Sequence, residues 1–452
     1  MTAGVFNTSF KINLPMKKFI ALLAGCLMTC LTFAQSAYEY NENGLDDYYD
    51  EDYDAAIKNF NEAIKLDPEF VEAYFNKGLV YDELEDYKAA ILEYTKAIEL
   101  DYYGAYNNRG LARYYLDDLT GAMADYNKAI DYDPDDNFAY YNRGNLKADL
   151  QELNGAIADY TKALEIDPED ADACFERGLA KYDLRDYHGA IADLNLVLAL
   201  MPNAVTAFYY RGLSKNELKD YAGAITDYDQ ALKLSPNYVD AYNDRGISKY
   251  NLRDYSGAIA DYTQATTLDP KFAKAFYNRG LAKADTKDYT GAIADYTQAI
   301  VILPKYARAY NNRGLAKAFQ KDYEGAVADY TKAIELDPQY AKAYFNRGNI
   351  IYDQKDYTKA LADYDQAIKY DPKFTKAYSY RGDTRTNLKD YPGAIADYTK
   401  AIELDPKYAE AYYYRGNAKS YAGDKTGACS DWKKSVELGR VDSTGTIAKN
   451  CN

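Results

Sequence analysis

The sequence predicts an all-α solenoid of twelve helix-turn-helix repeats. Glycine recurs at a nearly fixed interval, an alanine follows each of these glycines twelve residues later, and proline closes most of the repeats. Ten of the eleven glycine spacings are 34 residues, and the remaining one is 32. The repeat glycines are Gly44, Gly78, Gly110, Gly144, Gly178, Gly212, Gly246, Gly280, Gly314, Gly348, Gly382 and Gly416. A period of this length is typical of stacked repeats, not of a domain with one central core.

Each repeat has the pattern of two helices, as the repeat around Gly314 illustrates. Residues 307–320 contain no proline and are predicted to form the first helix, which residues 321–323 break. Residues 324–336 are predicted to form the second helix, which Pro338 ends because proline cannot continue a helix. Neither helix can bury its apolar face alone, so stacked neighbours are expected to form the core.

The repeat resembles the tetratricopeptide repeat over residues 37–438. Counted from the glycine, the matching positions are an aromatic residue four before it, alanine at plus twelve, an aromatic residue at plus sixteen, a small residue at plus nineteen and proline at plus twenty-four. Examples are Tyr344, Ala326, Tyr330, Ala333 and Pro338. The resemblance implies a right-handed superhelix whose first helices line a concave surface that binds other proteins. The family binds many kinds of partner, so the resemblance does not name one.

Charged residues mark a departure from the family, which usually has leucine just before the glycine. Ten copies here have arginine at that position, and each has an aspartate sixteen residues later, as in Arg279 and Asp295. The second repeat has Lys77 with Glu93 instead, and the first repeat has neither charge. Because the two charges change together, we expect an ion pair that joins the helices of one repeat or of adjacent repeats. A ladder of ligand-binding charges is the alternative.

Composition excludes several classes of function. The formal net charge is −16, and an acidic chain repels phosphate backbones, so we expect no binding to nucleic acid. His188 is the single histidine, which leaves no zinc constellation, and no recognisable nucleophile motif accompanies it. There is no glycine-rich phosphate loop. We therefore expect no enzyme activity, no catalytic residues, no metal and no cofactor.

The first 34 residues have the layout of an export signal. Residues 1–15 read as an upstream extension, with Met16 as an alternative start, and residues 16–34 combine a basic start, an apolar run and small residues before Gln35. An uncleaved membrane anchor is a second interpretation, although the apolar run is shorter than the ~20 residues of a spanning helix. A lipobox before Cys26 is a third. Cleavage after Ala34 predicts a periplasmic or secreted protein, and a lipid on Cys26 predicts an outer-membrane lipoprotein.

The C-terminal tail, residues 439–452, follows the last repeat and contains one cysteine. In an exported protein, Cys429 in the last helix and Cys451 in the tail are expected to form a disulfide, with two free thiols as the alternative. Cys174 occupies the aromatic position of its repeat and is expected to be a small core residue.

The candidate binding surface lies on the first helices, at the positions two before and five after each glycine. These positions point roughly away from the packed face at about 100° per residue. Asparagines there resemble the ladder of the O-linked N-acetylglucosamine transferase arrays, which holds the main chain of an extended peptide, and the acids between them would favour basic segments. A polar filler of an exposed stripe is the alternative. The candidate residues are Asn76, Asn108, Asn142, Asn278, Asn312, Asn346, Glu83, Asp149, Asp285 and Asp353.

Two functional hypotheses follow. The first is an exported, non-catalytic scaffold that binds extended, basic protein segments in its groove and meets the membrane through its signal or a lipid on Cys26 alone. The second is a cell-envelope structural or carbohydrate-binding protein that uses its 52 tyrosines as stacking surfaces. The sequence names no partner, no pathway and no oligomeric state.

Overall fold

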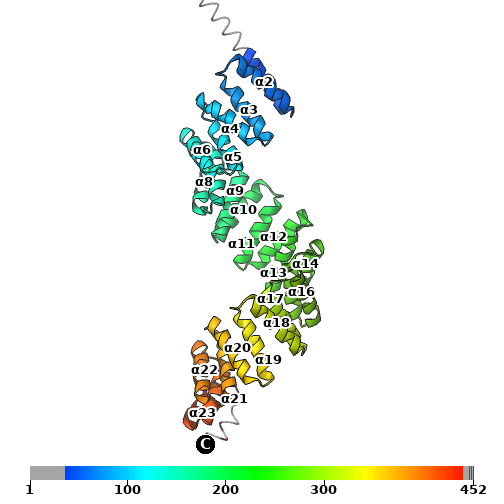
Figure 1. Ribbon diagram of the computed structural model, residues 1–452, viewed down its shortest axis with the longest axis vertical. Coiled ribbons are helices and arrows are strands. Elements are labelled where there is room, and N and C mark those ends of the chain that lie inside the picture. Colours follow the sequence, from blue (N-terminus) through cyan, green and yellow to red (C-terminus); the bar gives the residue numbers. More distant parts are fainter. Residues whose placement is uncertain (1–35, 441–446, 448, 450, 452) are drawn as a thin grey trace, which may run out of the picture. The chain divides into compact units, whose positions relative to one another are not determined.

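The computed structural model describes residues 36–440 together with residues 447, 449 and 451. The upstream extension, the signal segment, Cys26 and Ala34 lie outside these residues. The chain divides into two compact units between Leu218 and Lys219. Every regular element in the described part is an α-helix, and within each unit successive helices pack against one another in chain order (Figure 1).

The first unit begins with a helix over residues 36–49 and continues with ten further helices. They are α2 (Tyr53–Leu66), α3 (Val71–Glu83), α4 (Tyr87–Glu99), α5 (Ala105–Tyr115), α6 (Leu119–Tyr132), α7 (Asn137–Asp149), α8 (Leu153–Ile166), α9 (Ala171–Asp183), α10 (Tyr187–Leu200) and α11 (Val205–Glu217). From α3 onward, the odd-numbered helices are the first helices of their repeats.

The second unit continues the same alternation, beginning with a second helix. Its elements are α12 (Tyr221–Leu234), α13 (Val239–Asn251), α14 (Tyr255–Leu268), α15 (Ala273–Asp285), α16 (Tyr289–Ile302), α17 (Ala307–Phe319), α18 (Tyr323–Leu336), α19 (Ala341–Asp353), α20 (Tyr357–Tyr370), α21 (Thr375–Asn387), α22 (Tyr391–Leu404), α23 (Ala409–Tyr421) and α24 (Lys425–Glu437). The described helices together make twelve pairs, so the all-α repeat fold is confirmed.

The turn inside the repeat of Gly314 corrects the predicted helix boundaries by one residue. In the repeat of Gly314, α17 ends at Phe319 and α18 begins at Tyr323, one residue before the predicted start. The Asp322 carboxylate explains this start, because it accepts a hydrogen bond from the Gly325 amide at 2.9 Å and so caps the helix. Lys321, at φ 65°, reverses the chain direction before the cap.

The core of most repeats forms where a glycine meets an aromatic ring. At Gly280 a Cβ atom would lie 2.7 Å from Cε1 of Tyr296, so glycine lets the two helices approach closely. Tyr296 is almost completely buried among alanines that include Ala292. The same arrangement recurs along both units, with Phe60 or Trp432 replacing tyrosine at the two ends. Gly178 is an exception, because it faces Leu194 at 3.5 Å.

The arginine–aspartate pairs are buried ion pairs within single repeats. Arg279 donates from Nη2 to Asp295 at 2.6 Å and from Nε at 2.9 Å, so the contact is bidentate. Its Nη1 donates to Thr263 of the preceding repeat, and its guanidinium lies 5.3 Å from the centre of the Phe276 ring. The Arg279 side chain therefore connects the two helices of its own repeat and also binds the preceding repeat. Within the units the pair also recurs at Arg109–Asp125, Arg143–Asp159, Arg177–Asp193, Arg245–Asp261, Arg313–Asp329, Arg347–Asp363, Arg381–Asp397 and Arg415–Asp431.

The end of the chain is tied to the last helix. Cys429 of α24 and Cys451 form a disulfide with a Cα–Cα distance of 5.6 Å. Cys174 is a free, buried thiol whose pKa is raised to about 11, chiefly by burial. It therefore stays protonated at neutral pH and packs as a small core residue.

Candidate functional site

The candidate asparagines link the first helices of consecutive repeats to each other. Asn278 donates from Nδ2 to Asn243 of the preceding first helix at 2.9 Å. Asn312 donates to the Tyr277 hydroxyl at 3.0 Å. The remaining bonds of this kind run from Asn76 to Asn41, from Asn142 to Asn107 and from Asn346 to Asn311. Asn108 lies against the Tyr94 hydroxyl instead.

These bonds leave the asparagines with spare hydrogen-bonding capacity. An asparagine amide has two N–H donors and a carbonyl acceptor, and each inter-repeat bond uses one donor. The six side chains are half-buried, so each remains partly accessible to solvent. The sequence contained the signal for the inter-repeat bonds, because asparagine three before one glycine is matched by asparagine two before the next, as in Asn243 and Asn278. Sequence reasoning missed this coupling.

The candidate acids form a second row along the same helices. Glu83 accepts from the Tyr48 hydroxyl at 3.3 Å, and Asp285 accepts from Tyr250 at 2.5 Å. Asp149 accepts in the same way from Tyr114 of the preceding first helix. Asp353 is exposed. In the repeat before it, Ala318 stands at the position from which a tyrosine donates to the acid in the other three cases. All four acids are exposed to solvent and present negative charge beside the asparagines.

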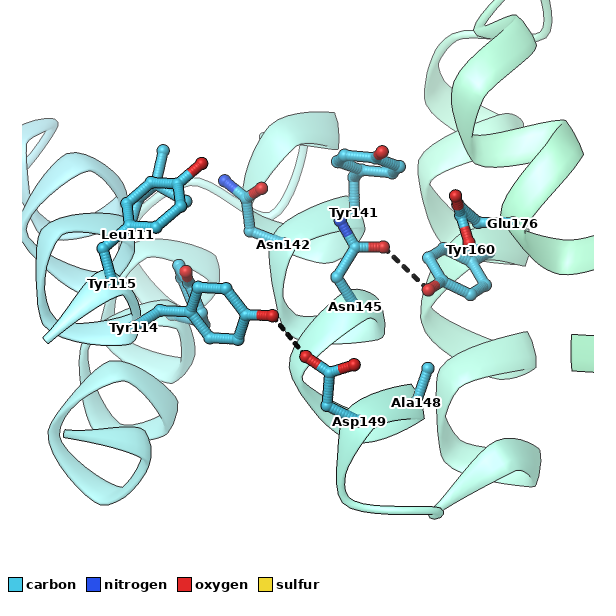
Figure 2. Close-up of a pocket in the computed structure, with 11 residues that line it drawn as sticks. Leu111, Tyr114, Tyr115, Tyr141, Asn142, Asn145, Ala148, Asp149, Tyr160 and Glu176 are labelled. Atoms are coloured by element: carbon cyan, nitrogen blue, oxygen red, sulfur yellow. Dashed lines mark hydrogen bonds between the residues drawn. The ribbon is translucent and has the colours of Figure 1, made fainter. Parts of the chain in front are cut away.

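A cavity of about 410 Å³ opens among the first helices of the first unit. Figure 2 shows side chains of α5, α7, α8 and α9 converging on it, with Tyr114 bonded to Asp149 and Tyr160 bonded to Asn145. It includes two residues predicted from the sequence, Asn142 and Asp149. It also includes tyrosines and Glu176, which sequence reasoning did not select as site residues. Glu176 stands at the candidate position two before Gly178, and it was missed because only the asparagines of that row were selected.

A second cavity, of about 320 Å³, lies in the second unit at matching repeat positions. Asn312 and Asp285 line it, and these are again residues predicted from the sequence. Leu281 and Leu315 occupy the position directly after their glycines, as Leu111 and Asn145 do in the first cavity. Two further hollows, of about 420 and 210 Å³, are lined mainly by second helices of the first unit. Four of the ten predicted residues thus line cavities of the first helices, and none lines these two hollows of the second helices.

Two carboxylates beside the packed rings have strongly shifted pKa values. Burial raises the pKa of Asp383 to about 6, although the hydrogen bond from Tyr398 at 2.7 Å and the charge of Arg440 act against this. Burial likewise raises the pKa of Asp82 to about 6, against a hydrogen bond from Tyr94. In other repeats neutral asparagines accept the equivalent bond, as Asn349 does from Tyr364. These two acids are therefore packing groups with an unfavourable charge.

Among the described residues, no group of three histidine, cysteine, aspartate or glutamate side chains is arranged to hold a metal ion. None of the described helices is both long enough and apolar enough to cross a membrane. His188 is exposed near the start of α10.

The fold defines a helical repeat protein, a class whose members typically mediate protein–protein interactions. Models described as TPR repeat or tetratricopeptide repeat match residues 44–85, 71–102, 110–151, 144–184, 212–253, 243–310, 319–355, 341–374 and 382–420. The chain belongs to the tetratricopeptide repeat family, as its resemblance predicted.

Similarity to individual proteins is more limited. A UDP-N-acetylglucosamine–peptide N-acetylglucosaminyltransferase from Giardia intestinalis (strain ATCC 50803 / WB clone C6) is 38% identical over 52 residues, which are 12% of this chain and 4% of that protein. The chain thus spans a small fraction of this relative. A chain of the APC/C hetero-tetramer Cut9–Hcn1 is 14% identical with a TM-score of 0.45, covering 94% of this chain and 99% of its own. YrrB, a TPR protein with an unusual peptide-binding site, is 28% identical with a TM-score of 0.37, covering 41% of this chain and 95% of its own.

Proposed function

We propose that the chain is a non-catalytic scaffold that holds extended protein segments along its first helices. The observation that carries this proposal is the recurrence of the same two groups, because a cavity in each unit is lined by an asparagine two before a glycine and by an acid five after a glycine. The acid belongs to the same repeat as the asparagine in the first unit and to the preceding repeat in the second. A segment that runs along the first helices would meet equivalent groups at each step. Such repetition suits an extended main chain, which itself presents a repeating set of donors and acceptors.

The chemistry of the two rows indicates how such a segment is held. The asparagine amides keep one N–H and, in most copies, the carbonyl oxygen for the peptide groups of the ligand. The exposed acids, such as Asp353, attract lysine and arginine side chains and repel acidic segments. We therefore expect binding to weaken as salt is added. The lone His188 and the absence of a nucleophile motif in the sequence support a non-catalytic role.

We also propose that the protein acts outside the cytoplasm. The layout of residues 16–34 supports export to the periplasm or the medium, and the lipobox before Cys26 supports an outer-membrane lipoprotein as the alternative. The disulfide between Cys429 and Cys451 fits an oxidising compartment.

The carbohydrate-binding alternative receives less support from the packing. Tyrosines sixteen residues after the glycines, such as Tyr262 and Tyr330, are buried against their own repeats. Their faces are therefore not available for stacking on sugars. Exposed rings such as Tyr115 and Phe319 remain, but they stack on Tyr87 and Tyr289 of the chain itself.

The test is capture of partner proteins by charge-reversal variants. Asp353→Arg changes the exposed acid of the groove, and Glu335→Arg makes the same change on the second helix α18, where the side chain is also exposed. Both variants and the unaltered chain are immobilised and exposed to an extract of the source cells, and the bound proteins are identified by mass. We expect that Asp353→Arg fails to capture proteins that Glu335→Arg still captures. Equal capture by both variants would place binding outside the groove.

A further inference from the structure

The cavity of the first unit carries negative charge that the protein does not neutralise. Asp149 and Glu176 both line it, and its wall contains no lysine, arginine or histidine. Within the part of the chain that the structure describes, neither carboxylate forms an ion pair with a basic side chain. The one hydrogen bond to Asp149 comes from the Tyr114 hydroxyl, which is neutral.

Aromatic rings form the other walls of this cavity. Tyr141 and Tyr160 lie with their ring centres 6.1 Å apart, and Tyr114 and Tyr115 lie on the opposite helix α5 (Figure 2). Ring faces attract cations, and arginine adds stacking of its planar guanidinium. Two carboxylates framed by tyrosines therefore match one basic side chain in both charge and shape.

The cavity of the second unit provides an internal comparison. Asn346 stands at the repeat position that Glu176 has in the first unit, two residues before its glycine. That second cavity is also lined by Lys287, which supplies a positive charge of the protein's own. Asp285, its carboxylate, accepts a hydrogen bond from Tyr250. The first cavity is thus distinguished by an additional acid and by the lack of a cation.

We propose that the cavity formed by α5, α7, α8 and α9 is a specificity pocket for one arginine side chain of a bound extended segment. The inference rests on the proposed function, because it assigns one position of the segment held along the first helices. The guanidinium would pair with Glu176 and Asp149 and stack on the tyrosine rings. Lysine would be accepted less well, because an ammonium group cannot pair with a carboxylate through two parallel bonds.

The environment of Glu176 is consistent with a cation site. Burial, and then the neighbouring charges of Asp172 and Asp149, raise the pKa of Glu176 above its usual range. The cavity also faces Tyr160, whose pKa is raised by burial and then by Glu176. A guanidinium between these groups would relieve the repulsion between the acids. The energetic cost of burying the carboxylate charge is therefore offset when a guanidinium fills the pocket.

The test selects ligands from a displayed library of random linear twelve-residue peptides against the full chain. Selection is repeated with Glu176→Gln and with Glu324→Gln. Glu324 is the matched control, because the same change removes the same charge at an exposed position of the second helix α18, away from the first-helix positions and from the cavity. The tightest peptide from the unaltered chain is then resynthesised with glutamine in place of its shared arginine. Its dissociation constant is measured with all three proteins.

We expect selected peptides to share one arginine, and Glu176→Gln to weaken the arginine peptide by about tenfold or more. The glutamine peptide should bind the unaltered chain and Glu176→Gln equally, and Glu324→Gln should behave as the unaltered chain does. Selected peptides without a shared basic residue would overturn the pocket and leave the scaffold function standing. An equal loss for both peptides in Glu176→Gln would also overturn it. Failure to select any peptide would overturn both proposals.

Discussion

Arg347 pairs with Asp363, and no second basic side chain among the described residues shares this carboxylate. The guanidinium lies 2.7 Å from the carboxylate, which is almost completely buried. In neighbouring repeats the aspartate is shared by two basic side chains, as Asp295 is by Arg279 and Lys283 at 2.6 and 2.8 Å. Ile351 stands where the repeat of Asp295 has Lys283. The pair in this repeat therefore depends on arginine alone.

This difference predicts unequal effects for the same substitution in two repeats. Arg347→Ala leaves a buried carboxylate without a cation and should cost about 3–5 kcal/mol of local stability. Arg279→Ala leaves Asp295 with Lys283 and should cost less, about 1–3 kcal/mol. Hydrogen exchange of the amides in α20 and α16 measures these costs repeat by repeat.

A double variant separates the pair from the packing of arginine. Removing both charges, as in Arg347→Ala with Asp363→Ala, should destabilise the repeat less than Arg347→Ala does, because no unpaired buried charge remains. Equal stabilities of the single and double variants would contradict the ion-pair interpretation.

The repeat glycines should respond to alanine according to the residue that they face. Gly280→Ala places a methyl group 2.7 Å from the Tyr296 ring and should destabilise its repeat by about 1–3 kcal/mol. Gly178→Ala meets atoms no nearer than 3.4 Å and should stabilise its repeat by up to about 1 kcal/mol, because alanine favours the helix. Urea unfolding of both variants tests the difference in sign. Destabilisation of equal size would show that close approach is not the reason for glycine.

The raised pKa of Asp383 predicts stability that falls as pH rises. Its folded value of about 6 lies above the ~3.9 of an unfolded aspartate, so the folded state binds the proton more tightly. The contribution of this group is therefore lost between about pH 4 and pH 6 and stays lost at neutral pH. Asp383→Asn keeps an acceptor for the Tyr398 hydroxyl, as Asn349 does for Tyr364, without the charge.

We expect Asp383→Asn to gain about 1–3 kcal/mol near neutral pH and little near pH 4. Urea unfolding of the variant and the unaltered chain at both pH values measures the difference, in which the parallel titration of Asp82 cancels. A gain that is independent of pH would contradict the account, because it would separate the stabilisation from the titration.

Reduction of the disulfide should loosen the last repeat alone. The bond between Cys429 and Cys451 closes a segment of 22 residues, and a loop of this size contributes about 3 kcal/mol. Exchange in α24 should rise after reduction or in Cys451→Ser, whereas exchange in α20 should not change. A rise of similar size in both helices would show that the tail stabilises more than its own repeat.

Most of the fold could be predicted from the sequence, because it follows from one repeated local pattern. The glycine period located every helix pair, and the joint variation of Arg279-type and Asp295-type charges identified a real contact. The first residue of α18 was missed by one position, because the capping role of Asp322 was not weighed. Lys283 was also missed as a partner of Asp295, although it lies one helical turn from Arg279 on the same face.

The candidate site was less predictable, because it depends on contacts between repeats. The asparagines were identified one repeat at a time, and their bonds to the preceding helix, such as Asn278 to Asn243, appear when two repeats are stacked. Glu176 joins Asp149 in one cavity because three first helices meet there. A period in the sequence gives the position of a residue within its repeat, but not which residues of adjacent repeats share a cavity.

The most direct test of the scaffold function is photo-crosslinking from inside the groove. A photoreactive residue is placed at Leu315, which lines the cavity of the second unit and is exposed, and in a separate variant at Lys332, which is exposed on α18. After irradiation in an extract of the source cells, crosslinked segments are identified by mass. The account predicts extended protein segments crosslinked at position 315 and few at position 332. Equal crosslinking at both positions, or none at 315, would contradict it.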